Sequence, residues 1–359
     1  VLKDGKGIAQ KIIEKLKTQN INVFEASHGK CFKKTDSGIF EVGSNGEDYM
    51  KLAEALAESG ITRIIHMMSM VHDSEVNSLE ELEDRKNRGI YSLFHLTRAL
   101  IANKVAKKIE IVLISDYANQ VTGQEKKIHP HNASLFVLGK VVGNEYGGIT
   151  CRSVDIDENT TAQQLEEELW AADTNYQVAY RDGNRYVEEF REFDMENAPA
   201  EEVDIKETGV YLITGGTGGI GLEISRYLAS RNKVNIAFIN RSKLPDKETW
   251  DDLISKNEDK KLCGKLQAIK ELEASGAKVV CCSADITSYN DLKGAIDGLK
   301  REFGRINGVV HSAGLAGEGL IIRKELDEFK KVIAPKMEGT WLLDRLTRQE
   351  QPDFFIMFS

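Results

Sequence analysis

The fold of this chain is decided by two neighbouring runs, TGVYLITGGTGGIG at residues 208–221 and VNIAFINRS at residues 234–242. The first run is an apolar segment that ends in a cluster of glycines. The residues between the two runs have helical spacing, and the second run is again apolar. This order predicts a β-strand, a tight glycine-rich turn, an α-helix and a second parallel β-strand, which together make one βαβ unit.

The spacing of the glycines favours a dinucleotide site over a purely structural turn. Glycines 215, 219 and 221 would let the backbone turn, approach a pyrophosphate and pack the helix against the strand. The N-terminus of the helix offers free N–H groups and a positive dipole to the phosphates. The candidate cofactor-binding residues of this turn are Thr214, Gly215, Gly216, Thr217, Gly218, Gly219 and Ile220.

The end of the second strand favours NADPH over NADH. A carboxylate about 20 residues after the glycines would hydrogen-bond a ribose 2′-hydroxyl and repel a 2′-phosphate. That position reads Asn240, Arg241 and Ser242, with no acid among them. Arg241 can offer its guanidinium to a phosphate and Ser242 can add a hydroxyl, although a solvated arginine at a strand end is also common.

Composition limits the classes of partner. The 359 residues carry a net charge of −9, which argues against a nucleic acid or an anionic membrane as the main partner. No apolar segment approaches the ~18 residues of a membrane span, and no signal peptide opens the chain. The five cysteines and seven histidines show no metal-ligand spacing. We expect a cytoplasmic protein without a metal.

Strand and helix patterns alternate along the chain, which predicts an α/β fold with two Rossmann-like, doubly wound parallel sheets. The polar segment 192–207 is the best boundary, so we divide the chain into subdomains 1–205 and 206–359. Residues 61–70 resemble 306–315, and residues 109–115 resemble 353–359. No glycine-rich turn is found before residue 209, and Ser78–Asp84 is interpreted as an acidic linker. We therefore interpret the first copy as degenerate and structural.

Two later strand ends supply further candidates for cofactor binding. Asp285 and Ile286 follow an apolar run, where a carboxylate could meet an adenine amino group or could cap a turn. Both interpretations remain open. Ser312, Ala313 and Gly314 end the next strand, and their small side chains leave room for a ribose and a nicotinamide.

Taken together, these motifs resemble the ketoreductase domains of modular polyketide synthases, which are short-chain dehydrogenase/reductases with a structural and a catalytic subdomain. The resemblance covers nearly all of the chain. It rests on TGGTGGIG (214–221), NRS (240–242), DIT (285–287), HSAG (311–314), PKMEGT (335–340) and the hairpin YRDGNRYV (180–187).

The resemblance implies reduction of a ketone on an acyl chain that an acyl carrier protein holds as a phosphopantetheine thioester. In this family NADPH supplies the hydride, a tyrosine supplies the proton, a lysine lowers the pKa of the tyrosine and a serine hydrogen-bonds the alkoxide. Lys336 matches the catalytic lysine, although outside its motif it would read as an ordinary exposed helix lysine. Neighbouring synthase domains are the other expected partners.

The serine, tyrosine and asparagine of the family's catalytic set are not among the 359 residues at their expected places. The resemblance places the serine one residue after Ser359, and the tyrosine and an asparagine beyond it. It therefore implies a second subdomain that is incomplete at its C-terminal end, and a fragment that is inactive although its parent is an enzyme.

The residues after the HSAG motif bear on the configuration of the product, and two other functions remain as alternatives. Ala316, Gly317 and Glu318 stand where one group of these reductases carries Leu-Asp-Asp, which leans toward an L-hydroxy product. One rival is a non-catalytic structural dinucleotide-fold domain of a synthase, which the intact glycines and Arg241 disfavour. The other is a stand-alone short-chain dehydrogenase, which the degenerate first half disfavours.

Overall fold

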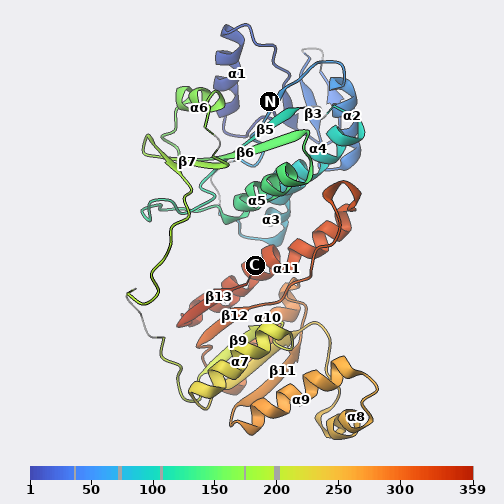
Figure 1. The fold of residues 1–359 in the computed structure, drawn as a ribbon, viewed down its shortest axis with the longest axis vertical. Helices are drawn as coiled ribbons and strands as arrows, with labels where there is room; N and C mark the ends of the chain where they lie inside the picture. The colour runs from blue at the N-terminus through green and yellow to red at the C-terminus, as the bar shows by residue number, and fades with distance from the viewer. Residues whose placement is uncertain (36–37, 72–74, 106–107, 174, 198–202, 359) are drawn as a thin grey trace. The chain divides into compact units, whose positions relative to one another are not determined.

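A computed structural model describes residues 1–35, 38–71, 75–105, 108–173, 175–197 and 203–358. They form two compact units (Figure 1). The first unit contains Val1–Glu192 and Gly319–Lys324, and the second contains Phe193–Glu318 and Glu325–Ser359. Part of the polar boundary segment (198–202) and Ser359 itself lie outside the described residues. None of the described helices is long and apolar enough to span a membrane.

The second unit is built on one parallel sheet with the strand order β11-β10-β9-β12-β13. Chain order reverses between β9 and β12, and open α/β sheets bind ligands at such a switch point. The glycine-rich turn follows β9 directly, so the fold places it there. The strands are β9 (Val210–Thr214), β10 (Asn235–Asn240), β11 (Lys278–Ser283), β12 (Gly308–His311) and β13 (Phe354–Met357).

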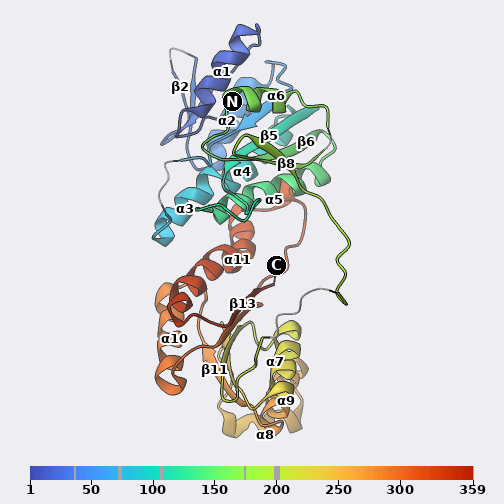
Figure 2. The same ribbon diagram turned by 90° about the vertical axis from the view of Figure 1, so that its left-hand side faces the viewer.

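Helices cover both faces of this sheet, with α7 and α9 on one face and α10 and α11 on the other (Figure 2). Their bounds are α7 (Gly219–Arg231), α8 (Trp250–Lys256), α9 (Lys260–Ala274), α10 (Tyr289–Phe303) and α11 (Leu326–Thr347). Strand β9 is buried along its whole length. Its apolar side chains pack with those of β10 and α9, so the strand that carries the turn is fixed at the centre of the core.

The first unit repeats this topology, with the single residue Leu2 in the place of the central strand. Leu2 forms parallel bridges with Ala26 and His66. It thereby joins a small sheet, ordered β1-β3-β2, to a larger one, ordered β4-β5-β6-β7-β8. The order β3, β1, Leu2, β4, β5 matches β11, β10, β9, β12, β13, as the resemblance between the two halves predicts. The strands are β1 (Ala26–His28), β2 (Lys33–Lys34), β3 (Phe40–Val42), β4 (Arg63–His66), β5 (Ile109–Asp116), β6 (Ile149–Ile156), β7 (Gln177–Arg181) and β8 (Asn184–Val187).

The helices of the first unit correct one expectation. They are α1 (Ile8–Thr18), α2 (Gly46–Leu56), α3 (Leu79–Arg88), α4 (Ile90–Ala102), α5 (Pro130–Glu145) and α6 (Ala162–Leu169). The supposed acidic linker at Ser78–Asp84 is the start of α3. Ser78 caps this helix by accepting a hydrogen bond from the Glu81 N–H, and Leu82 is buried. Acidic residues in a first turn complement the helix dipole, so the charge run favours a helix here.

The expectation that no glycine turn precedes residue 209 is also wrong. Asp4, Gly5, Lys6 and Gly7 connect Leu2 to α1, in the topological place of the glycine-rich turn in the second unit. The Asp4 carboxylate accepts hydrogen bonds from the backbone N–H groups of Lys6 (2.9 Å), Ile8 (3.0 Å) and Ala9 (2.9 Å). The turn is therefore present, but the chain's own carboxylate occupies the helix N-terminus. The sequence hid it because a single residue stands for the strand.

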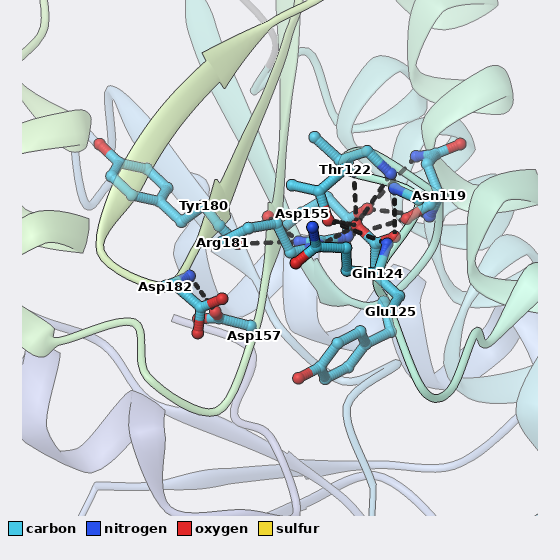
Figure 3. Close-up of polar contacts among 12 residues, drawn as sticks. Asn119, Thr122, Gln124, Glu125, Asp155, Asp157, Tyr180, Arg181 and Asp182 are labelled. Carbon is cyan, nitrogen blue, oxygen red and sulfur yellow. Dashed lines mark hydrogen bonds and ion pairs between the residues drawn. The ribbon is translucent and has the colours of Figure 1, made fainter.

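A buried charge cluster surrounds Arg181 in the first unit (Figure 3). Arg181, in the β7–β8 hairpin, forms ion pairs with Asp155 (2.9 Å) and Glu125 (3.3 Å) and donates to the Asn119 carbonyl at 2.9 Å. All three charged side chains are nearly inaccessible. Burial raises the pKa of Asp155, and the Arg181 charge offsets part of that rise. The arginine thus ties the loop after β5 to β6 and β7.

Candidate cofactor and lysine site

The glycine-rich turn of the second unit has backbone geometry that larger residues would disturb. Gly215 has a φ of +66°, and a Cβ there would lie 2.9 Å from the Ala313 Cα. At Gly216 a Cβ would lie 1.9 Å from the buried ring of Phe238, and at Gly221 it would lie 2.7 Å from the Gly216 Cα. The glycines therefore bring the turn against β10, the β12 end and the start of α7.

The N-terminus of α7 is open to a ligand. The N-cap residue, Gly218, makes no side-chain capping hydrogen bond, and Gly218, Gly219 and Ile220 are exposed. A Cβ at Gly219 would meet no atom within 4 Å. A helix start with free N–H groups, open space and no capping side chain suits a phosphate. The turn thus fits the pyrophosphate of a dinucleotide.

The end of β10 carries the residues predicted to select the cofactor. Asn240 ends the strand, and its side-chain oxygen accepts a hydrogen bond from the Thr217 hydroxyl at 3.3 Å. This bond links the glycine-rich turn to the strand end. Arg241 and Ser242 follow and are exposed, so the structure leaves the guanidinium in solvent beside the switch point.

Asp285 lies in a turn that it stabilises itself. Its carboxylate accepts hydrogen bonds from the Thr287 N–H at 2.9 Å and from the Thr287 hydroxyl at 2.7 Å. Ile286 is buried. The structure thus shows the turn role of Asp285, and this role leaves its backbone at the end of β11, beside the strand that carries Arg241.

The end of β12 is bonded to the end of β9. The Ser312 hydroxyl donates to the Thr214 carbonyl at 2.7 Å, and the Ala313 N–H donates to the Thr214 hydroxyl at 3.3 Å. That hydroxyl also lies 2.7 Å from Nδ1 of His311. The small residues predicted at this strand end therefore stand next to the glycine-rich turn.

Lys336 lies on α11 beside the same strand end. A Cβ on Gly314 would lie 3.1 Å from Cε and 3.3 Å from Nζ of Lys336, so the glycine leaves room for the lysine. The ammonium group donates a hydrogen bond to the Phe358 carbonyl, just after β13. Burial lowers the pKa of Lys336. The lysine is thus held at the carboxyl ends of β12 and β13.

The structure brings most of the predicted residues to one edge of the sheet, through the ends of β9, β12 and β13. It also shows two residues that sequence reasoning did not select. His311 is buried between Thr214 and α11. Gly339 packs against Ile286: a Cβ added at Gly339 would lie 2.9 Å from Cδ1 of Ile286. Their only sequence signal is that each belongs to a quoted motif.

Within the described ranges, no group of three or more His, Cys, Asp or Glu side chains could hold a metal ion.

Comparisons with known proteins indicate the family of the chain. Residues 209–359 match the family model described as KR domain, and residues 4–171 match the one described as beta-ketoacyl synthase-like, N-terminal. The chain is 32% identical over 235 residues to polyketide synthase PksL of Bacillus subtilis, covering 63% of this chain and 5% of that protein. It is 28% identical over 323 residues to 6-methylsalicylic acid synthase of Penicillium expansum, covering 88% of this chain and 17% of that one. The chain thus spans a small part of these relatives.

Among solved structures, the chain is similar to an N-terminal ketoreductase from the macrolactin assembly line. The two share 28% sequence identity with a TM-score of 0.79, over 100% of this chain and 69% of that one. A ketoreductase-containing multidomain structure of a keto acid-selecting NRPS module matches with a TM-score of 0.84 at 21% identity, which supports the fold alone.

Proposed function

Since this chain belongs to the ketoreductase domains of polyketide synthases, we propose that it contributes the cofactor site and the catalytic lysine to an NADPH-dependent reductase of ketoacyl thioesters. One observation carries the proposal. The uncapped N-terminus of α7, which follows the glycine-rich turn, lies at the same edge of the sheet as Lys336. The ammonium group of Lys336 is hydrogen-bonded to the Phe358 carbonyl just after β13. An oxidoreductase needs such a pairing of a dinucleotide cradle with a polar group beside the reacting carbon.

The cofactor is NADPH rather than NADH. The cofactor-binding residues are those of the turn from Thr214 to Ile220, the strand end at Asn240, Arg241 and Ser242, the turn at Asp285 and Ile286, and the small residues Ser312, Ala313 and Gly314. NADPH supplies the hydride when bound. Arg241 is exposed with no acid beside it in the sequence, so its guanidinium is available to a 2′-phosphate.

Lys336 is the catalytic lysine of the proposal. Its ammonium group lies in a partly buried place, which lowers its pKa, and a positive charge there would favour the phenolate of a neighbouring tyrosine. The resemblance places that tyrosine, a serine for the alkoxide and an asparagine after Ser359. Reduction is therefore expected only from a polypeptide that includes them.

The substrate is a ketoacyl thioester on the phosphopantetheine arm of an acyl carrier protein, and neighbouring synthase domains are the other partners. Residues 1–205 serve as the structural subdomain and residues 206–359 as the NADPH-binding subdomain. The capped turn at Asp4 supports this division of labour. The L-hydroxy configuration of the product and a cytoplasmic location stay predictions.

The proposal is tested with a polypeptide that continues about 100 residues past Ser359, enough to complete a domain. NADPH binding is followed by fluorescence, and reduction is followed on a simple ketoacyl thioester. We expect binding with turnover, and Lys336→Ala should abolish turnover while the NADPH Kd changes by less than about threefold. Arg241→Ala should weaken NADPH and leave NADH binding unchanged.

Two outcomes would contradict the proposal. Binding without turnover on any ketoacyl thioester would favour a structural domain of a synthase that has lost reduction. Absence of NADPH binding would overturn the interpretation of the glycine-rich turn.

A further inference from the structure

The imidazole of His311 connects two elements that meet at the site. It stands at the end of β12 and is 1% exposed. Its Nδ1 lies 2.7 Å from the Thr214 hydroxyl, at the start of the glycine-rich turn. Its Nε2 lies 2.8 Å from the carbonyl oxygen of Pro335 on α11. Pro335 immediately precedes Lys336 in the chain.

The partners determine which nitrogen carries the proton. A carbonyl oxygen only accepts, so Nε2 must donate to Pro335. Burial lowers the pKa of His311, so the ring is neutral and Nδ1 accepts from the Thr214 hydroxyl. The hydroxyl oxygen in turn accepts from the Ala313 N–H. The result is a directed chain of hydrogen bonds from the cofactor turn to the backbone of the lysine helix.

We infer that His311 is a positioning residue for Lys336, because its bond to the Pro335 carbonyl fixes how α11 is rotated and how far it lies from β12. This inference rests on the proposed function, in which Lys336 acts on a neighbouring tyrosine. The bond adds a directional constraint to the other contacts of α11 at this strand end, which are the packing of Gly339 and the bond from the Lys336 ammonium to the Phe358 carbonyl. A displacement of about 1 Å at a reacting group can reduce a rate roughly 100-fold.

The first unit supports this assignment by contrast. His66 occupies the same place at the end of β4, and it is also buried. Its Nε2 meets the Ser92 hydroxyl at 2.6 Å, and its Nδ1 has no hydrogen-bond partner among the described residues. That histidine therefore contacts a helix side chain and does not reach a turn. Of these two histidines, His311 alone joins a turn to a helix backbone in the described structure.

Two substitutions separate the two bonds of His311. The amide of Asn overlays the Nδ1 position, so His311→Asn keeps the Thr214 bond and loses the Pro335 bond. The longer side chain of Gln brings an N–H near the Nε2 position, so His311→Gln keeps the Pro335 bond. The measurements are the hydride-transfer rate and the NADPH Kd in a polypeptide extended past Ser359. A third measurement is the pKa of Lys336, by NMR of the ¹³C-methylated lysines, with Lys336→Arg to assign the signal.

We expect H311N to slow hydride transfer roughly 10- to 100-fold with the NADPH Kd changed less than about threefold. Its Lys336 should titrate higher, toward an exposed lysine. H311Q should restore the rate to within about threefold of the native protein. The Lys336 titration reads the position of the lysine without catalysis, so it separates this inference from a failure of the proposed function.

The inference is overturned if H311N matches the native protein in both rate and Lys336 titration. It is equally overturned if H311N and H311Q lose rate in proportion to their loss of Tm, which would indicate a structural role only. Gly339→Ala tests the same contact from the helix without removing a polar group. The added Cβ would press on Ile286 and lie 3.7 Å from Cε1 of His311, and we expect a smaller loss in the same direction. An unchanged rate and Lys336 titration in that variant would also count against the inference.

Discussion

The two turns that follow the central strands differ in what satisfies the helix N-terminus. In the first unit the Asp4 carboxylate accepts three backbone N–H groups at the start of α1. In the second unit no side chain of the described residues caps α7. The topology is the same in both. In the first unit the chain itself thus supplies the anion that a ligand would otherwise bring to the helix N-terminus, which agrees with the structural role we propose for it.

The strand ends next to these turns differ in the same way. In the first unit Asp116 ends β5. Lys6 forms an ion pair with it at 2.7 Å, and Nδ1 of His129 lies 3.3 Å from its carboxylate. Burial raises the pKa of Asp116, but His129 and Lys6 outweigh this effect and lower it. In the second unit the corresponding edge holds Lys336 beside a glycine and a carbonyl. In the first unit the end of β5 thus carries paired charges, and in the second unit Lys336 has no carboxylate bonded to it in the described structure.

The largest effect should come from the buried charge cluster of the first unit. Arg181→Met leaves Asp155 and Glu125 buried without their cation, which costs about 3–5 kcal/mol of unfolding free energy. Urea unfolding with hydrogen exchange resolved by unit would measure it. NADPH binding by the second unit should persist at low denaturant. Arg191→Met is the matched control, since that arginine is exposed and its ion pair contributes little. Equal costs for the two variants would contradict the view that the first unit is held by internal charge.

The next effect should distinguish the two turns directly. Gly215→Ala places a Cβ against the Ala313 backbone at a φ of +66°, so we expect the NADPH Kd to rise roughly 100-fold. Gly7→Ala has a similar φ of +83° but open space around the Cβ, so it should cost about 1 kcal/mol of stability. Its NADPH Kd should stay within about threefold of the native value. A comparable loss of binding in both variants would break the comparison.

Acid should destabilise the first unit through His66, which is buried, and His131, which is partly buried. Burial lowers the pKa of His66 and of His131 to about 4. The unfolded chain therefore takes up protons below its histidine pKa of about 6.5, while the folded unit does not. Stability is fully present above that pH and falls as the pH decreases toward 4. Between pH 7 and 5.5 we expect a loss of about 1 kcal/mol per histidine, which His66→Gln should halve. A pH-independent unfolding free energy over this range would contradict the neutral state of both rings.

The smallest effect should come from the capping carboxylate. Asp4→Ala removes the acceptor for three N–H groups and should destabilise the first unit by about 1 kcal/mol, measured by urea unfolding. Asp4→Asn keeps an acceptor oxygen and should lose only a few tenths of that amount. Isothermal titration with inorganic pyrophosphate would sharpen the comparison. A second, weak binding event that appears only in Asp4→Ala, beside the one expected at the N-terminus of α7, would show that the carboxylate stands in for an anion. A native protein that already shows both binding events would contradict it.

The sequence by itself determined the second unit well, because its signals are local. The glycines of 215–221 sit between an apolar strand and a helical run, and each is needed within a few residues of the others. Apolar runs such as 210–214 and 308–311 predict buried parallel strands by composition alone. The doubly wound fold and the echo between the two halves follow from such patterns, whereas Lys336 is singled out only by the family resemblance.

Tertiary structure alone decided which polar groups meet. Lys6 and Asp116 are 110 residues apart, and Thr214 and His311 are 97 apart, so no local pattern indicates either contact. The central strand of the first unit is reduced to Leu2, too short to be recognised from its sequence. Hydrogen bonds and ion pairs depend on geometry at the level of an ångström, which only the packed sheets provide, whereas strand and helix patterns depend on burial and spacing that the sequence carries itself.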